Sequence, residues 1–477
     1  MRSIVHLLLI MSSSRHLGLI LTTILLLGSV MTPLAAQQLP PGVPGTSRGY
    51  QTTPQELREI AAKAAAGLEP YHSAVDQVLE WADRKWDYKL DEHERCKSSN
   101  NPAWIDSERG VGRLYARALA YHLTGDLRYA EETKTTLEQI MSTVQTISLS
   151  DQQCRLNFGW GTPELVAAAD LIEDYWFGLT CIGPLDTHYG VSEIGFGPCK
   201  VLFQNWLVKN PYYVVSYTAE DSQSNWGAAA TTTLAYIADY LWDRPDVRLI
   251  HRVPEQINGG KEMEFTPAEA YAHANQLALD RMNGYRVDYH SSRGCDFLSG
   301  EQQLPDFAPV KSQITEKGII PEDARREEAC NIPRYNGEYQ NYPQVHLGNV
   351  IQQCELMWRR GDRSCYDNID MTDIPDYTYV DGKGQRHTTH LYPGRGSIER
   401  AIDAIIVDSS TEWKHDSALE VAYRYYVQYS RFGNVAQWAK ELNRPSNCSQ
   451  DMCFGTLTHG FAPDEAPAPP PTVAPPQ

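Results

Sequence analysis

The sequence predicts an all-α fold, an (α/α)n toroid or incomplete barrel of helical hairpins with a cleft at one rim. Apolar residues recur at helical spacing in paired segments along most of the chain, while alternating β-type patterns are few and short, chiefly near residues 212–217. The connections between neighbouring segments are only a few residues long and contain turn residues, which is typical of helical hairpins. A helical solenoid that serves only for binding is the alternative interpretation.

The N-terminal segment has the composition of a signal peptide. Arg2, His6 and Arg15 accompany the apolar run 17–30, and small residues follow up to Ala36. We therefore expect residues 1–36 to be removed during export, with an uncleaved membrane anchor as the alternative. No later segment reaches about 20 apolar residues. The expectation is a secreted or periplasmic protein with no membrane span after signal removal.

The rest of the chain divides by composition into three parts. Residues 37–52 are rich in Pro, Gly and Gln and are expected to form a flexible leader. Residues 53–461 carry the helical pattern and are expected to form one α/α-toroid domain. Residues 462–477, rich in Pro and Ala, predict a disordered tail of polyproline character.

Local signals place the helices in order along the chain. Thr53, followed by Pro54 and Glu56, indicates an N-cap with Pro at the first helical position, so the first helix is expected to continue to residue 66. Gly125 lies between two periodic segments and indicates a helix end, because glycine readily adopts the left-handed C-cap conformation. The other predicted helices cover residues 71–86, 110–123, 127–144, 162–175, 225–240, 267–283, 347–359, 397–407 and 417–429.

Charge and aromatic content restrict the partners. A net charge of -18 argues against nucleic acid, and an anionic polymer would need a local basic patch on this acidic chain. The 11 Trp and 27 Tyr offer aromatic surfaces of the kind that stack against sugars, although most aromatic side chains belong to the core. We expect a monomer.

The ten cysteines are an even number in an exported chain, which predicts disulfides. Three pairs are close in sequence, and the other four cysteines leave the pairing of two further bridges open. No Cys or His cluster has zinc spacing, so we expect neither a metal nor a cofactor. The close pairs are Cys181 with Cys199, Cys354 with Cys365 and Cys448 with Cys453, and the others are Cys96, Cys154, Cys295 and Cys330.

Residues 318–361 place arginine, tyrosine and amide side chains just ahead of an amphipathic helix. A guanidinium grips a carboxylate at two points, and a tyrosine beside a cation can lose and return a proton. This stretch therefore predicts a site for an acidic substrate. The alternative is a core stripe of aromatics with a solvated face of arginines.

Four segments carry a resemblance to a known family. They are the Leu-Ala-Tyr-His-Leu-Thr-Gly-Asp-Leu-Arg-Tyr-Ala hairpin at 119–130, Asn-Trp-Gly at 225–227, Gly-Ile-Ile-Pro-Glu-Asp-Ala-Arg at 318–325, and Tyr342 standing 13 residues before Glu355. With these segments in this order, the chain resembles the alginate-lyase-like polysaccharide lyases of α/α-toroid fold. The family motif Asn-Asn-His-Ser-Tyr-Trp reads Ser-Gln-Ser-Asn-Trp at 222–226 here, without the histidine, and Asn341 stands where a histidine is common.

The resemblance implies a lyase that cleaves a uronic-acid polymer, alginate or a glucuronan-like chain, by β-elimination. Such an enzyme neutralises the sugar carboxylate, removes the C5 proton and protonates the leaving oxygen. Tyr342 is then the base and acid, with Tyr339 and Tyr289 as substitutes for it. The candidates for neutralising the carboxylate are Asn225, His290, Arg325 and Arg334.

Each of these residues has a structural alternative: a plain N-cap for Asn225, a surface turn for His290, and salt bridges for the arginines. The expected substrate-binding residues are Trp160, Trp226 and Tyr335 as stacking surfaces, with Tyr289 and Arg293 in a polar, turn-like stretch.

Two rival functions remain open. A glycoside hydrolase on the same architecture would use paired carboxylates, for example Asp221 with Glu322 or Glu338. A non-catalytic glycan-binding protein would fit the missing histidine motif.

Overall fold

The structure is a computed structural model that separates into two compact units, Met1–Gln38 and Leu39–Gln477. The described residues all belong to the second unit, so the predicted signal peptide and most of the Pro-rich tail lie outside them. They are residues 42–90, 93–94, 104–255, 257–288, 295–296, 302–303, 310–311, 314–315, 317–325, 341–370, 377–380, 386–389, 396–408, 412–462 and 465.

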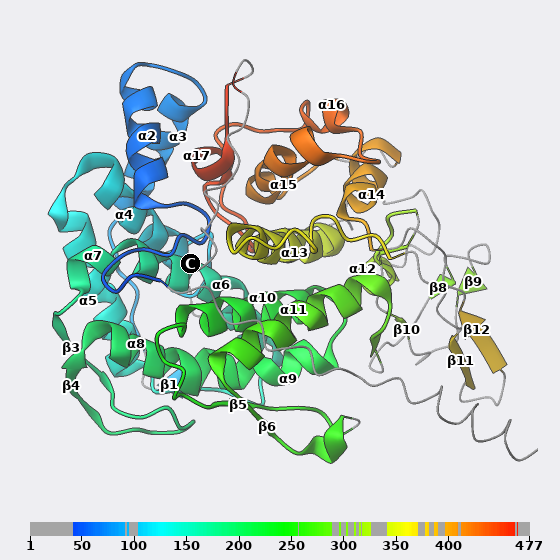
Figure 1. Cartoon of the computed structure of the whole chain (residues 1–477), viewed down its shortest axis with the longest axis horizontal. Coiled ribbons are helices and arrows are strands. Elements are labelled where there is room, and N and C mark those ends of the chain that lie inside the picture. Colours follow the sequence, from blue (N-terminus) through cyan, green and yellow to red (C-terminus); the bar gives the residue numbers. More distant parts are fainter. Residues whose placement is uncertain are drawn as a thin grey trace, which may run out of the picture. The chain divides into compact units, whose positions relative to one another are not determined.

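Most of the described residues are helical, which confirms the predicted fold class (Figure 1). The α-helices are α2 (Pro54–Ala65), α3 (Tyr71–Ala82), α4 (Gly110–Thr124), α5 (Leu127–Thr143), α6 (Gln152–Leu171), α7 (Glu173–Trp176), α8 (Cys199–Leu207), α9 (Tyr213–Asp221), α10 (Asn225–Tyr240), α11 (Pro267–Asn283), α12 (Pro321–Arg325), α13 (Asn341–Arg359), α14 (Ile398–Asp403), α15 (Asp416–Tyr429), α16 (Val435–Trp438) and α17 (Gly455–His459). The π-helices are η1 (Val208–Tyr212) and η3 (Ala404–Asp408), and η2 (Asn258–Gly260) is a 3₁₀ helix.

The strands of the described part form two-stranded ladders only. Five ladders are antiparallel, and β1 with β2 is parallel. The pairs are β1 (His93–Glu94) with β2 (Thr146–Ile147), β3 (Thr180–Pro184) with β4 (Ile194–Pro198), β5 (Leu249–His251) with β6 (Met263–Phe265), β7 (Val287–Asp288) with β10 (Val310–Lys311), β8 (Cys295–Asp296) with β9 (Gln302–Gln303), and β11 (Tyr377–Val380) with β12 (Arg386–Thr389).

Helix α10 is the centre of the helix packing. It contacts α6, α9, α11 and α13. From α13 the contacts continue through α15 to α17, and from α6 they continue through α4 to α3. Because α17 packs against α2 and α3, helices from the two ends of the domain meet and the contacts close into a circuit (Figure 1). A closed circuit of helices agrees with the expected toroid, while the rim cleft stays a prediction.

Helices α10 and α13 join two apolar clusters. One cluster gathers side chains from α2 to α11, and the other gathers side chains of α13, α14 and α15. Ala228 of α10 belongs to the second cluster and Leu356 of α13 to the first. Helices α10 and α13 are therefore both anchored in close-packed apolar side chains, which holds their N-terminal ends in place.

Several helix ends agree with their local signals. The Thr53 hydroxyl accepts the Glu56 N–H and the Glu56 carboxylate accepts the Thr53 N–H, so α2 begins with the expected capping box. Helix α4 ends at Gly125, whose φ of 73° lies in the left-handed region. Helices α10 and α11 have the predicted bounds.

The predicted start of α6 is wrong, because the helix begins at Gln152 rather than at residue 162. Asp151 caps it by accepting the N–H groups of Gln153 and Cys154. Gly159 and Gly161 lie inside the helix, where a Cβ on Gly161 would come within 2.2 Å of the Ile105 carbonyl oxygen. These glycines permit close packing and do not mark a turn.

Two further expectations are wrong. Residues 212–217 are helical, in η1 and α9, and not extended. Val214 and Val215 are fully buried there, so tertiary packing overrides their strand propensity. Helix α13 begins at Asn341 rather than at residue 347, which places Tyr342 in its first turn.

The three close disulfides are confirmed, Cys181–Cys199, Cys354–Cys365 and Cys448–Cys453. Cys154 is disulfide-bonded as well. Within the described ranges, no helix has the length and apolar character that crossing a membrane requires.

Candidate functional site

Tyr342 lies in the first turn of α13 and is 39% exposed. This accessibility is unusual for the part of the chain around it, because the helix is buried from Pro343 to Arg359. His346 follows one turn later, and side chains four residues apart lie on the same face of a helix. Asn341 and Tyr342 are therefore the exposed start of a helix whose following side chains are buried.

Asp323 of α12 connects the starts of α10 and α13. One carboxylate oxygen accepts the backbone N–H of Asn225 at 3.1 Å, and the other accepts Nδ1 of His346 at 2.7 Å. Asp323 is fully buried, and His346 is 2% exposed. A carboxylate at a helix N-terminus is favoured by the helix dipole, which explains why this one tolerates burial.

A second His–Asp pair supports the residue just before Tyr342. Nδ1 of His415 donates to Asp451 at 2.5 Å, and its Nε2 lies 3.2 Å from the side-chain oxygen of Asn341. Asp451 also accepts the Ser449 hydroxyl at 2.8 Å. The contact with Asn341 orients the first residue of α13.

Asp451 reaches α13 because residue 348 is a glycine. A Cβ at Gly348 would lie 1.6 Å from the Asp451 carboxylate, so any side chain there would displace it. Asp323 with His346 and Asp451 with His415 therefore both contact the N-terminal half of the helix that carries Tyr342. Both histidines are buried, so they support the helix from the interior and do not face solvent.

Asn225 is the first residue of α10 and is 1% exposed. It is not the N-cap, because Ser224 takes that position and accepts the Trp226 N–H at 3.3 Å. The structure connects Asn225 to the Tyr342 helix through Asp323 and His346. Its role toward a substrate stays a prediction.

For the other predicted site residues, the structure gives only a position in a helix or no position at all. Arg325 ends α12, and its side chain is not described. Trp226 is half-buried in the first turn of α10, and Trp160 is half-buried within α6. Both stacking roles stay predictions. The residues that lie outside the described ranges are Tyr289, His290, Arg293, Arg334, Tyr335 and Tyr339.

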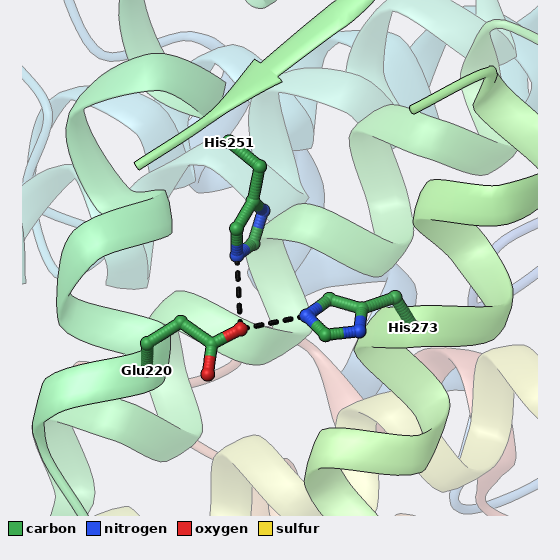
Figure 2. Close-up of side chains that lie close together, drawn as sticks. All are labelled: Glu220, His251 and His273. Atoms are coloured by element: carbon green, nitrogen blue, oxygen red, sulfur yellow. Dashed lines mark hydrogen bonds and ion pairs between the residues drawn. The ribbon is translucent and has the colours of Figure 1, made fainter. Parts of the chain in front are cut away.

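A second polar cluster adjoins the start of α10. Glu220, near the end of α9, accepts Nε2 of His251 at 3.1 Å and Nε2 of His273 at 2.6 Å on the same carboxylate oxygen (Figure 2). Its other oxygen accepts the guanidinium of Arg286 at 2.6 Å. These contacts join α9, β5 and α11 around one buried carboxylate.

The charge state of Glu220 follows from these contacts. Burial alone would raise the pKa of this carboxyl, but hydrogen bonds from His251 and His273 and the charge of Arg286 hold the pKa well below its usual range. Burial lowers the pKa of His251. Glu220 is therefore an anion throughout the physiological range.

Arg281 lies between the two clusters. Its guanidinium donates to the Ala219 carbonyl at 2.9 Å and approaches Gly227 of α10. Burial lowers the pKa of Arg281 to about 9, Arg286 adds to the decrease, and Glu220 and Asp323 oppose it. The start of α10 thus lies near the buried guanidinium of Arg281 and near the carboxylates of Glu220 and Asp323.

Sequence reasoning did not identify Glu220, His251 and His273. They are 31 and 53 residues apart along the chain, measured from Glu220, and they come from a helix, a strand and another helix. No local spacing motif spans such distances. Only the pairing of β5 with β6 and the packing of α9 on β5 bring them together.

No protein-family model and no curated protein matches this sequence. Among solved structures, the chain is similar to an alginate lyase from Bacteroides ovatus, with a TM-score of 0.48 and 12% identity over 87% of this chain and 99% of the other. A likeness at this level establishes neither family nor reaction, so the functional argument rests on the site itself.

Proposed function

We propose that this protein is an exported polysaccharide lyase that cleaves a uronic-acid polymer, alginate or a glucuronan-like chain, by β-elimination. The observation that carries the proposal is the accessible phenol of Tyr342 on a helix start held by two buried His–Asp pairs. A base that must meet a polymer has to be exposed, and the groups that orient it have to be rigid. Tyr342 meets both requirements.

The chemistry needs a proton acceptor and a site of positive potential. The C5 proton of a uronate is weakly acidic because the adjacent carboxylate is negative, so that charge must be neutralised as the enediolate develops. Tyr342 takes the C5 proton and returns a proton to the leaving glycosidic oxygen. The C5–H bond and the bond from C4 to the glycosidic oxygen break, a C4–C5 double bond forms, and the elimination needs no external oxidant or reductant.

Two arginines and two carboxylates, Glu220 and Asp323, lie near the start of α10. Helix N-termini carry partial positive charge, and Arg281 and Arg286 lie beside this one. Asn225 is our first candidate for contacting the sugar carboxylate, with His290, Arg325 and Arg334 as further candidates.

Disulfides support the exported location. Cys181–Cys199, Cys354–Cys365 and Cys448–Cys453 are of the kind that persists in oxidising compartments.

A panel of polyuronates tests the proposal. The purified chain is incubated with alginate, glucuronan and other uronate polymers, and products are followed by ultraviolet absorbance and mass spectrometry. Unsaturated uronate ends are expected from one of them. Saturated products would identify a hydrolase, and calorimetric binding without products would identify a glycan-binding protein. Either result would overturn the lyase proposal.

A further inference from the structure

We propose that Glu220, His251 and His273 form a binding site for one transition-metal ion, with zinc as the best match. Each residue offers one ligand atom, and the three atoms lie within 4.8 Å of one another. Two imidazoles and one carboxylate are a donor set that proteins use for zinc, with a fourth position left for water. Figure 2 shows both imidazole Nε2 atoms pointing at the same carboxylate oxygen.

The distances suit a shared ion. Ligand atoms in tetrahedral zinc sites lie about 2.0–2.2 Å from the metal, which places neighbouring ligand atoms about 3.3 Å apart. The Nε2 of His251 is 3.1 Å and the Nε2 of His273 is 2.6 Å from the Glu220 oxygen. Both distances are shorter than this spacing, so the side chains would rotate apart to admit the ion between them.

The surrounding groups already hold the ligands in position. Nδ1 of His251 lies 3.2 Å from the hydroxyl of Tyr212, which is buried, and Arg286 holds the second oxygen of Glu220. Metal-binding histidines generally use their second nitrogen in such a contact, which fixes the ring orientation. With Oε2 occupied by Arg286, Glu220 would bind through Oε1 alone.

Burial and access favour an ion over a purely internal ion pair. The side chains of Glu220 and His251 are 1% and 0% exposed, whereas that of His273 is 28% exposed. Two of the three ligands are thus buried and the third is in partial contact with solvent. The imidazoles select against calcium and magnesium, which prefer oxygen ligands.

Metal content measures the proposal directly. The full chain is dialysed against a chelator and then against buffer, loaded with zinc chloride and desalted, and its zinc is counted by mass spectrometry. About one zinc per chain is expected, with no comparable uptake of calcium or magnesium. Glu220→Gln and His273→Ala are each expected to reduce the count at least fivefold.

His72→Ala is the matched control, because His72 is an exposed histidine paired with Asp76 on the surface of α3. It should retain the full zinc count. Anomalous diffraction at the zinc edge of the wild-type chain is a second readout that does not depend on whether the variants fold. A peak between Glu220 and the two histidines is expected.

Less than about a tenth of a zinc per chain, or an unchanged count in Glu220→Gln and His273→Ala, would show that the three residues form only an ion-pair network. The same conclusion follows if the anomalous peak lies elsewhere. These readouts involve no sugar, so a failure here leaves the lyase proposal standing, and inactivity on polyuronates leaves the metal site standing.

Discussion

Asp323 accepts the backbone N–H of Asn225 at 3.1 Å, although the two residues are 98 positions apart in the chain. The bond fixes the start of α10 relative to α12, and through His346 it fixes α13 as well. The carboxylate of Asp323 therefore stabilises the fold and also positions the helices that carry Asn225 and Tyr342 in the proposed site.

Replacing Asp323 with asparagine tests this relationship. The variant keeps an oxygen for the Asn225 N–H but places an amide against Nδ1 of His346. We expect a loss of about 1–3 kcal/mol in the free energy of unfolding, the range for a buried polar group left without its partner. Urea denaturation measures it. Asp76→Asn, at an exposed carboxylate, is the control and should change stability by less than about 0.5 kcal/mol; equal effects of the two substitutions would contradict the assigned role.

Tyr342→Phe is expected to abolish the formation of unsaturated products on any polymer that the wild-type chain cleaves. The substitution removes only the hydroxyl that carries the proton, and the side chain is 39% exposed, so the melting temperature should hardly change. Tyr285→Phe is the control, because Tyr285 is similarly exposed at 49% and its hydroxyl donates to Asp370. Retention of more than a few per cent of activity in Tyr342→Phe would remove Tyr342 from the mechanism.

Asp239→Ala should destabilise the fold strongly. The buried carboxylate pairs with Arg48 and with Arg360, each at 2.8 Å. Its removal leaves two buried guanidinium groups without their counter-charge, and breaking such a pair costs about 3–5 kcal/mol. Chemical denaturation or the yield of folded protein reports the effect.

The control for Asp239→Ala is Glu80→Ala, which breaks the surface pair with Arg84 and should cost less than about 1 kcal/mol. If Asp239→Ala costs no more than Glu80→Ala, the buried pairs contribute little.

Glu164 predicts a pH dependence of stability. Burial raises the pKa of this carboxyl to about 8, from the ordinary glutamate value of 4.5. The folded chain therefore keeps a proton that the unfolded chain releases, so the contribution to stability is complete below about pH 4.5 and is lost as pH rises toward 8. The slope from this group is about 1.4 kcal/mol per pH unit.

Glu164→Gln removes that slope. Its stability relative to the wild type should increase by several kcal/mol between pH 5 and pH 8, as measured by urea denaturation at both values. Glu131→Gln, on the exposed face of α5, should show the same small difference at both pH values. A constant difference between Glu164→Gln and wild type would show that Glu164 does not hold its proton.

The helical class and many helix ends could be predicted because their signals are local. Thr53 with Glu56, Gly125, and the bounds of α10 and α11 depend on capping groups and apolar spacing within a few residues. The three close disulfides were also predictable, since their cysteines are near one another in the chain. The place of Tyr342 before a buried helix was recognised as well, although the start of that helix was not.

The other features depend on what packs against each residue. Gly159 and Gly161 are typical of a turn by sequence, but in the structure they allow α10 and Ile105 to approach α6 closely. Val214 and Val215 are typical of a strand by sequence, but in the structure they are buried within a helix.

The sequence by itself determined the helical class, several helix ends and a short list of chemically capable side chains, because short-range hydrogen bonding and apolar spacing set these. Only the tertiary structure decided that Asp323 joins Asn225 to His346 and that Glu220 meets His251 and His273. Contacts between residues 23 to 98 positions apart arise from the packing of whole helices and strands, and no local pattern records them.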